Sequence, residues 1–149
     1  MNKWTNISVW TLMLLAIVSL GGCGEDTTDN TLQVSAPQAL AEARQVMYEG
    51  VVSSDPIVRL HATEALDYSV GAEAGDVFIA GLTDESDGVR FASAMAIGDH
   101  EYAPAAEVLK LRFVEEESKM VRPGLIYASY RLGDNSHMEE LAKLLFDAD

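Results

Sequence analysis

The sequence has little cysteine and little positive charge. Cys23 is the only cysteine, so the chain cannot form an internal disulfide bond. Ten lysine and arginine residues stand against 24 aspartate and glutamate residues, and the formal net charge is −14 at pH 7. A surface of this charge supports solubility and repels the phosphates of nucleic acids and the headgroups of anionic lipids. We therefore expect no nucleic-acid partner.

The sequence also lacks the common catalytic and metal-binding motifs. His100-Glu101 matches the start of a zinc-protease helix, but Pro104 stands where the second histidine belongs. The spacing of His61, His100 and His137 favours ordinary surface or partly buried histidines over a metal site. No Gly-x-Ser-x-Gly motif and no phosphate-binding glycine loop is present. We predict a protein that is not an enzyme, with no catalytic residues, metal site or cofactor.

The chain begins with the pattern of an exported protein. Lys3 precedes an apolar run from Ile7 to Leu20, which has the length of a signal-peptide hydrophobic region. A helix that rises about 1.5 Å per residue needs about 20 apolar residues to cross a bilayer core of roughly 30 Å. A permanent membrane span is therefore the less favoured alternative, and we expect residues 1–22 to be a signal peptide.

The end of this run resembles the lipobox of bacterial lipoproteins, because Leu20-Gly21-Gly22-Cys23 places two residues with minimal side chains before a cysteine. The resemblance implies cleavage before Cys23, a diacylglyceryl group on its thiol and, in many species, an acylated amino terminus. Two or more acyl chains hold a protein stably on a membrane, whereas one chain holds it only marginally. The alternative is a lone cysteine at the end of an ordinary signal peptide.

The residues after Cys23 indicate which membrane holds the protein and how far the next domain lies from its anchor. In enteric bacteria an aspartate after the cysteine retains such lipoproteins at the inner membrane, and Gly24 stands there instead. The resemblance therefore favours the cell envelope, with a lipid anchor at the periplasmic face of the outer membrane. Residues 23–35 are expected to form the lipidated cysteine and a polar, flexible linker. At about 3.3 Å per residue, this linker holds the next domain at most about 40 Å from the anchor.

The rest of the chain, residues 36–149, contains an internal repeat. Three Val-Arg pairs recur at a nearly constant spacing, and an alanine follows each arginine by six residues: Val58-Arg59, Val89-Arg90 and Val121-Arg122. The first two copies place apolar or small residues at i, i+4, i+7 and i+8, the spacing of one buried helix face. These residues are Val58, Ala62, Ala65 and Leu66 in the first copy, and Val89, Ser93, Ala96 and Ile97 in the second.

Capping residues and shorter amphipathic segments complete the pattern. Asp55, Ser86 and Ser118 stand three residues before the valines, where their side chains can accept hydrogen bonds from the first turn of a helix. A second helix is expected after each of these first helices, and one helix before them all. The expected segments are 75–82, 103–114 and 136–146, with the N-terminal helix at 37–51. The pattern thus predicts seven helices and no strand.

The repeated core Val-Arg-x-x-Ala-x-x-Ala-Leu, with Leu132-Gly133-Asp134 closing the third copy, resembles the short HEAT-like repeats also found in phycobilisome lyases. The resemblance covers roughly residue 36 to the C-terminus. It implies an all-α fold: a short right-handed α-solenoid of about three helix pairs plus the N-terminal helix. The second helices would line its concave side. Pro123 and Gly124 depart from the pattern, because they stand just inside the third copy's helix.

One arginine recurs in each copy, and we call Arg59, Arg90 and Arg122 the arginine ladder. Each guanidinium can satisfy carboxylates and carbonyls of a neighbouring repeat, such as Asp99 or Asp134. We favour this structural interpretation, and an anion-binding row is the alternative. The three glutamates at 115–117 are expected to form a solvated helix end rather than a calcium site.

A protein-binding surface is the remaining candidate site. The predicted buried stripe of the central second helix consists of Ala106, Leu109 and Phe113. It leaves Glu107, Lys110 and Val114 on the opposite side, where we expect a protein partner. The expected function is a membrane-anchored, non-catalytic scaffold of the cell envelope. The alternatives are an accessory subunit of an envelope enzyme or assembly, and a bilin lyase-like enzyme, which rests on the family resemblance alone.

The predicted lipid anchor depends on one atom, the sulfur of Cys23, and can be tested by removing it. Replacing Cys23→Ala removes the thiol that would carry the lipid, so fatty-acid labelling of the protein in growing cells should be lost. The precursor should then remain unprocessed or leave the membrane fraction. Radiolabel that persists in the Cys23→Ala protein would contradict the prediction.

Overall fold

The structure, a computed structural model, describes residues 35–146; the predicted signal peptide and Cys23 lie outside this range. Its helices are α2 (Ala36–Gly50), α3 (Pro56–Ser69), α4 (Gly75–Gly81), α5 (Asp87–Asp99), α6 (Ala106–Glu115), α7 (Arg122–Arg131) and α8 (Met138–Phe146). Short 3₁₀ turns, Gly71–Ala74 and Ala103–Ala105, lead into α4 and α6. Residues 35–146 contain no strand, and none of their helices is long and apolar enough to cross a membrane.

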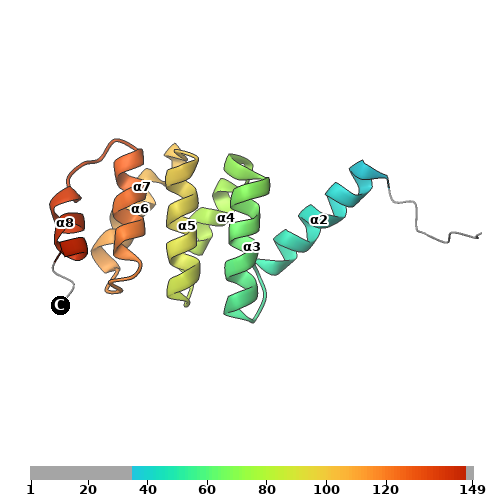
Figure 1. The fold of residues 1–149 in the computed structure, drawn as a ribbon, viewed down its shortest axis with the longest axis horizontal. Coiled ribbons are helices and arrows are strands. Elements are labelled where there is room, and N and C mark those ends of the chain that lie inside the picture. The colour runs from blue at the N-terminus through green and yellow to red at the C-terminus, as the bar shows by residue number, and fades with distance from the viewer. Residues whose placement is uncertain (1–34, 147–149) are drawn as a thin grey trace, which may run out of the picture. The chain divides into compact units, whose positions relative to one another are not determined.

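The helices stack in successive pairs. α3, α5 and α7 lie side by side as the first helices, with α4 and α6 behind them (Figure 1). Each second helix packs against the next first helix, α4 against α5 and α6 against α7, and α8 packs on α7. α2 precedes the row and packs on α3. The prediction of an all-α fold with seven helices arranged as a short solenoid is confirmed.

The starts of the first helices follow local chemistry. Asp55 caps α3, because its Oδ1 accepts a hydrogen bond of 2.8 Å from the Ile57 amide. Ser86 stands at the N-cap of α5 without a side-chain cap bond. The third cap was predicted wrongly, because α7 begins at Arg122 and not after Ser118. Pro123 has no amide hydrogen and fits only the first turn of a helix, which moves the start of α7 towards it.

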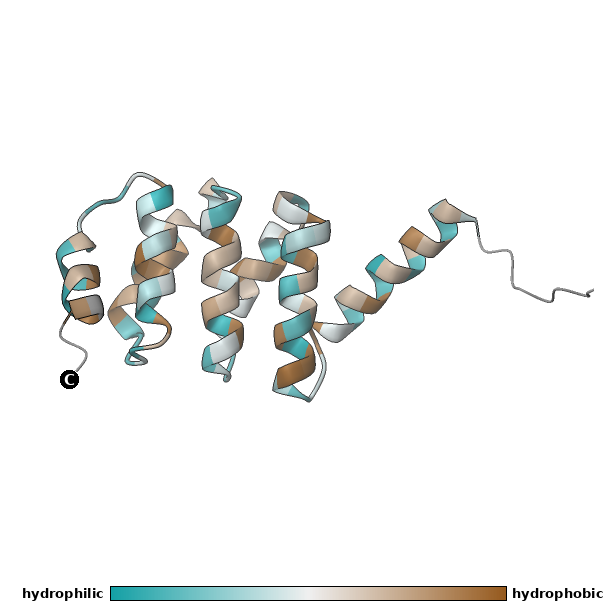
Figure 2. Ribbon diagram, in the orientation of Figure 1, coloured by the Kyte–Doolittle hydropathy of each residue, from teal (hydrophilic) through white to brown (hydrophobic). Residues whose placement is uncertain are grey.

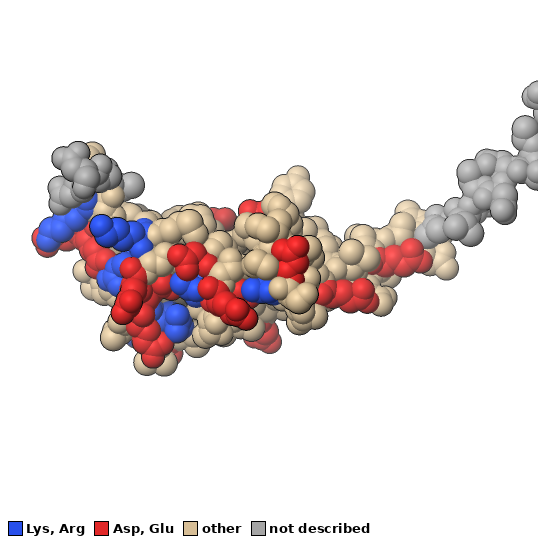
Figure 3. Space-filling model, turned by 90° about the horizontal axis from the view of Figure 1, so that it is seen from below, with Lys and Arg blue, Asp and Glu red and all other residues tan. Residues whose placement is uncertain are grey.

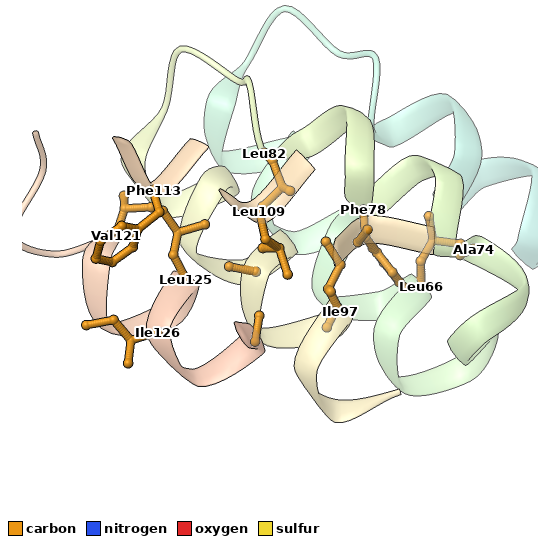
Figure 4. Packing of buried hydrophobic residues seen from close by; sticks show 14 residues of the cluster. Leu66, Ala74, Phe78, Leu82, Ile97, Leu109, Phe113, Val121, Leu125 and Ile126 are labelled. Carbon is orange, nitrogen blue, oxygen red and sulfur yellow. The ribbon is translucent and has the colours of Figure 1, made fainter. Parts of the chain in front are cut away.

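The core runs between the two rows of helices. Leu66, Phe78 and Leu109 are fully buried and come from α3, α4 and α6, and Figure 4 shows these side chains within one cluster. The predicted stripe of α5 is confirmed, since all four of its residues are buried. The stripe of α3 is wrong at Val58, which is 44% exposed, because only part of α2 covers this end of the stack. A terminal repeat has a neighbour on one side only.

Close contact between α5 and α7 depends on a glycine. A Cβ atom at Gly98 would stand 2.6 Å from Cε1 of Tyr127 and 3.1 Å from the Ala128 Cα atom. The tyrosine ring can move, but the backbone of α7 cannot move without displacing the helix. Gly88, at the other end of α5, has more room, since its Cβ would meet Leu60 Cδ2 at 3.4 Å.

We expect Gly98→Ala to lower the free energy of unfolding by about 1–3 kcal/mol, because it overpacks the contact between α5 and α7. Gly88→Ala is the matched control and should leave the free energy of unfolding unchanged or slightly raised, because alanine favours helix over glycine by about 1 kcal/mol. Urea unfolding of the full chain measures both. Equal stability of the two variants would contradict the packing argument.

Candidate functional site

The arginine ladder has one geometry at all three positions. In each repeat the arginine Nη1 donates a hydrogen bond to the backbone carbonyl six residues earlier. The three bonds are Arg59 to Ser53 at 2.9 Å, Arg90 to Asp84 at 2.7 Å and Arg122 to Glu116 at 2.7 Å. Each guanidinium therefore holds the loop that leads into its own helix.

The same guanidinium groups also reach a carboxylate further along the chain. Arg59 binds Asp84 through two hydrogen bonds of 2.7 and 2.8 Å. The other two pairs are Arg90 with Glu116, at 2.8 and 3.1 Å, and Arg122 with Glu140, at 2.5 Å. The pairs of Arg59 and Arg90 are bidentate, and such pairs are among the stronger hydrogen bonds of proteins.

The partners expected from the sequence were wrong. Asp99 accepts a hydrogen bond from the Tyr127 hydroxyl, and Asp134 accepts one from the Ser136 hydroxyl. Both aspartates lie at or beyond the C-terminal end of a first helix, whereas the ladder lies near the start of these helices. For Arg59 and Arg90 the loop before the next first helix supplies the carboxylate instead, and for Arg122 the first turn of α8 supplies Glu140.

Glu116 is the functional residue that the sequence interpretation missed. Its side chain is only 3% exposed, so the prediction that residues 115–117 form a solvated helix end is wrong at this position. Glu116 Oε1 also accepts a hydrogen bond of 3.0 Å from the Ser118 amide, as Asp84 Oδ1 accepts one from the Ser86 amide. The signal was present in the repeat, because Asp84 and Glu116 each stand six residues before an arginine of the ladder.

The ladder keeps its carboxylates charged. The hydrogen bond from Arg59 is the largest cause that holds the pKa of Asp84 below its usual range. Burial raises the pKa of Glu116, but the hydrogen bonds from Arg90 and the Ser118 amide outweigh burial and leave this pKa lowered. The guanidinium groups of the ladder already bind charged carboxylates of the same chain. This favours the structural interpretation of the ladder over an anion-binding row. Positive and negative side chains lie interspersed on one face of the molecule (Figure 3).

The predicted partner-binding residues lie on the exposed side of α6. Glu107 and Lys110 pair at 2.7 Å, and this hydrogen bond raises the pKa of Lys110. Val114 is 84% exposed, and Leu111, which the prediction omitted, is 65% exposed. The four residues stand at i, i+3, i+4 and i+7, which is one face of a helix. Beside this face an open hollow of about 340 Å³ lies between α6 and the end of α7, and Lys110 lines it.

The opposite side of α6 anchors the helix in the core. Leu109 is 1% exposed and Phe113 is 8% exposed, as the predicted stripe required, whereas Ala106 is only half-buried. The stripe fixes which way α6 turns its exposed face.

The histidines occupy separate positions. His61 Nδ1 lies 3.0 Å from Glu64 at the surface, and His100 Nε2 lies 2.8 Å from Asp67. The His137 ring stacks obliquely on Phe113, with 3.7 Å between ring centres. Within residues 35–146, no three histidine, cysteine, aspartate or glutamate side chains are grouped so that they could hold a metal ion.

Comparison with known proteins agrees with the stacked helix pairs. A family model described as HEAT repeats matches residues 45–129, which is more than half of the chain. The chain belongs to the HEAT repeat family. No curated protein matches the chain. HEAT repeats generally serve as protein-interaction and scaffold modules, so the HEAT repeat itself indicates a binding function.

The middle arginine of these HEAT repeats gives the test of the ladder. Arg90→Ala should lower the free energy of unfolding by about 1–3 kcal/mol, because it leaves Glu116 buried without its partner. Arg90→Lys should recover only part of the free energy of unfolding that Arg90→Ala loses, since lysine cannot form the bidentate pair. Thermal and urea unfolding of the full chain measure both.

The control for the ladder is Lys143→Ala, which removes an exposed pair with Glu139. Exposed pairs contribute about 0–1 kcal/mol, so this variant should unfold almost as the original chain does. Unchanged stability of Arg90→Ala together with loss of anion binding would favour the anion-binding row instead.

Proposed function

We propose that this chain is a non-catalytic protein-binding module that a lipid on Cys23 holds in the cell envelope. The observation that carries the binding role is the exposed apolar pair on α6, Leu111 and Val114. These two residues lie beside a charged pair, Glu107 and Lys110, so apolar area and charge share one helix face.

The physical case rests on what this face gains by being covered. Complete burial of a valine or leucine side chain contributes about 1.5–3 kcal/mol relative to exposure. The packing of Leu109 and Phe113 in the core already fixes the helix, so binding orders little additional backbone. A few residues near the centre of an interface commonly supply most of the binding energy, and α6 lies between the other two helices of its row, α4 and α8, along the chain.

The location of the module is proposed from the N-terminal sequence. The export pattern of residues 1–22 and the glycines before Cys23 support a lipid anchor, and Gly24 supports the periplasmic face of the outer membrane. A flexible linker of residues 24–35 would let the repeat domain search about 40 Å from the membrane surface for its partner. An accessory subunit of an envelope assembly would use the same face.

Charge exchange on α6 tests the binding face. The double variant Glu107→Lys and Lys110→Glu keeps an intrahelical pair but reverses the charge pattern, so stability should stay near that of the original chain. We expect the tagged full chain with this change to capture at least about tenfold less partner from crosslinked membranes, because mismatched charges at an interface cost several kcal/mol. Quantitative mass spectrometry of the captured proteins gives the ratio.

The matched control exchanges Glu117→Lys and Lys119→Glu, two exposed residues in the loop after α6. Glu116, in the same loop, is left unchanged because it binds Arg90. Capture that falls equally in both double variants would contradict the α6 face as the binding surface.

A further inference from the structure

α2 carries an apolar face that the described residues leave uncovered. Ser35 and Gln38 form a capping box that stabilises the start of the helix. No residue of α2 is buried, and Leu40 and Val46 are 56% and 65% exposed. Apolar residues recur along its length in Figure 2. We call Ala36, Ala39, Leu40, Ala43 and Val46 the free face of α2; all five are exposed and fall on one side of the helix.

The position of α2 in the stack indicates that a neighbouring helix is missing from this face. Only the last turns of α2 contact α3: the Met47 sulfur accepts a hydrogen bond from Ser69, and a Cβ atom at Gly50 would stand 2.7 Å from the Ala62 Cβ. α2 packs against α3 as α4 packs against α5 and α6 against α7. It therefore holds the place of a second helix, but within residues 35–146 no first helix precedes it (Figure 1). Repeat stacks normally close such an end with a polar outer surface.

The residues of the free face fit another helix. Ala36, Ala39 and Ala43 have short side chains, which allow a second helix axis to approach closely, while Leu40 and Val46 can insert between the side chains of that helix. Burying this face removes apolar area from water, which favours binding by about 25 cal/mol for each Å².

The rim of the free face is acidic. Glu42 and Glu49 follow one edge of α2 and are exposed. On the other edge Glu73 is 75% exposed and lies 3.8 Å from Arg44, the only basic residue of the helix. An occupant of matching charge carries lysine or arginine on the flank of its apolar stripe that meets Glu42 and Glu49.

Two other occupants fit less well. A second copy of this chain would bring the rims of Glu42 and Glu49 together, and the few turns of the free face are small beside the roughly 800 Å² per partner of a stable interface. A lipid surface favours helices with lysine or arginine on the polar face, whereas the polar face of α2 carries glutamate and glutamine.

We propose that the free face of α2 is a docking site for a basic amphipathic helix of a partner protein, which takes the place of the missing first helix. This site lies on a different helix from the α6 face and does not depend on it.

The test uses the full chain in phosphatidylcholine nanodiscs and a fluorescent synthetic peptide. The peptide is a helix with leucine and alanine along one stripe and lysine on one flank of that stripe; a second peptide has glutamate in place of lysine. Fluorescence anisotropy should show that the lysine peptide binds more tightly than the glutamate peptide. Ala43→Glu should raise the Kd of the lysine peptide at least about tenfold, which corresponds to about 1.4 kcal/mol. Ala41→Glu, the same exchange at an exposed position on another side of α2, should leave the Kd unchanged.

Each of the following results would overturn the proposal. The first is either no binding of the lysine peptide or equal binding by the Ala43→Glu and Ala41→Glu chains. The second is equal binding of the two peptides, which would refute the charge argument. The third is a dimer of the chain that Ala43→Glu dissociates, which would assign the face to a second copy. The exchange at Glu107 and Lys110 should not alter peptide binding, so this site and the α6 face can fail separately.

Discussion

One bridge per repeat holds this stack together, and the pair of Arg90 with Glu116 shows how it works. The arginine ties the loop before its own helix to the carboxylate of the loop before the next helix. The carboxylate in turn accepts the Ser118 amide of that second loop. The bridges of Arg59 and Arg90 thus set the spacing between neighbouring first helices, and the close contact of Gly98 with α7 requires this spacing. Burial of the small and apolar faces supplies the free energy, and the bridges supply the register.

A stack built from such local links has open ends and open sides. Every internal repeat contacts only its neighbours, so the fold itself provides no closing element. The free face of α2 follows from this at the N-terminal end, as does the partial exposure of Val58. The exposed residues of α6 follow at the side, because one face of that helix suffices to hold it in the core. Binding surfaces on a stack of this kind are the faces that its own packing does not use.

The sequence predicts the helices well and the loops poorly, for a physical reason. A period of 3.6 residues shows which side of α5 is buried, and the recurrence of Val-Arg shows that helix pairs repeat. The same rules placed Glu107, Lys110 and Val114 on the exposed side of α6, but they did not select Leu111 beside them. They also missed Glu116, because the partner of a buried charge depends on where a loop lies in space. The start of α7 was misplaced for a related reason, since Pro123 overrides the cap at Ser118.

The ion pairs also determine which charges the chain presents to a partner. All six arginines within residues 35–146 lie within 4 Å of a carboxylate. Most of the positive charge within residues 35–146 is therefore paired with a carboxylate of the same chain, and the net charge that the chain presents to partners is strongly negative. Such a surface mainly raises the rate at which a basic partner arrives and rejects acidic competitors, while apolar contacts decide how long the partner stays. Acidic residues beside the apolar residues of α2 combine both effects, and a membrane tether would add to them by confining the module to a thin layer near its partner.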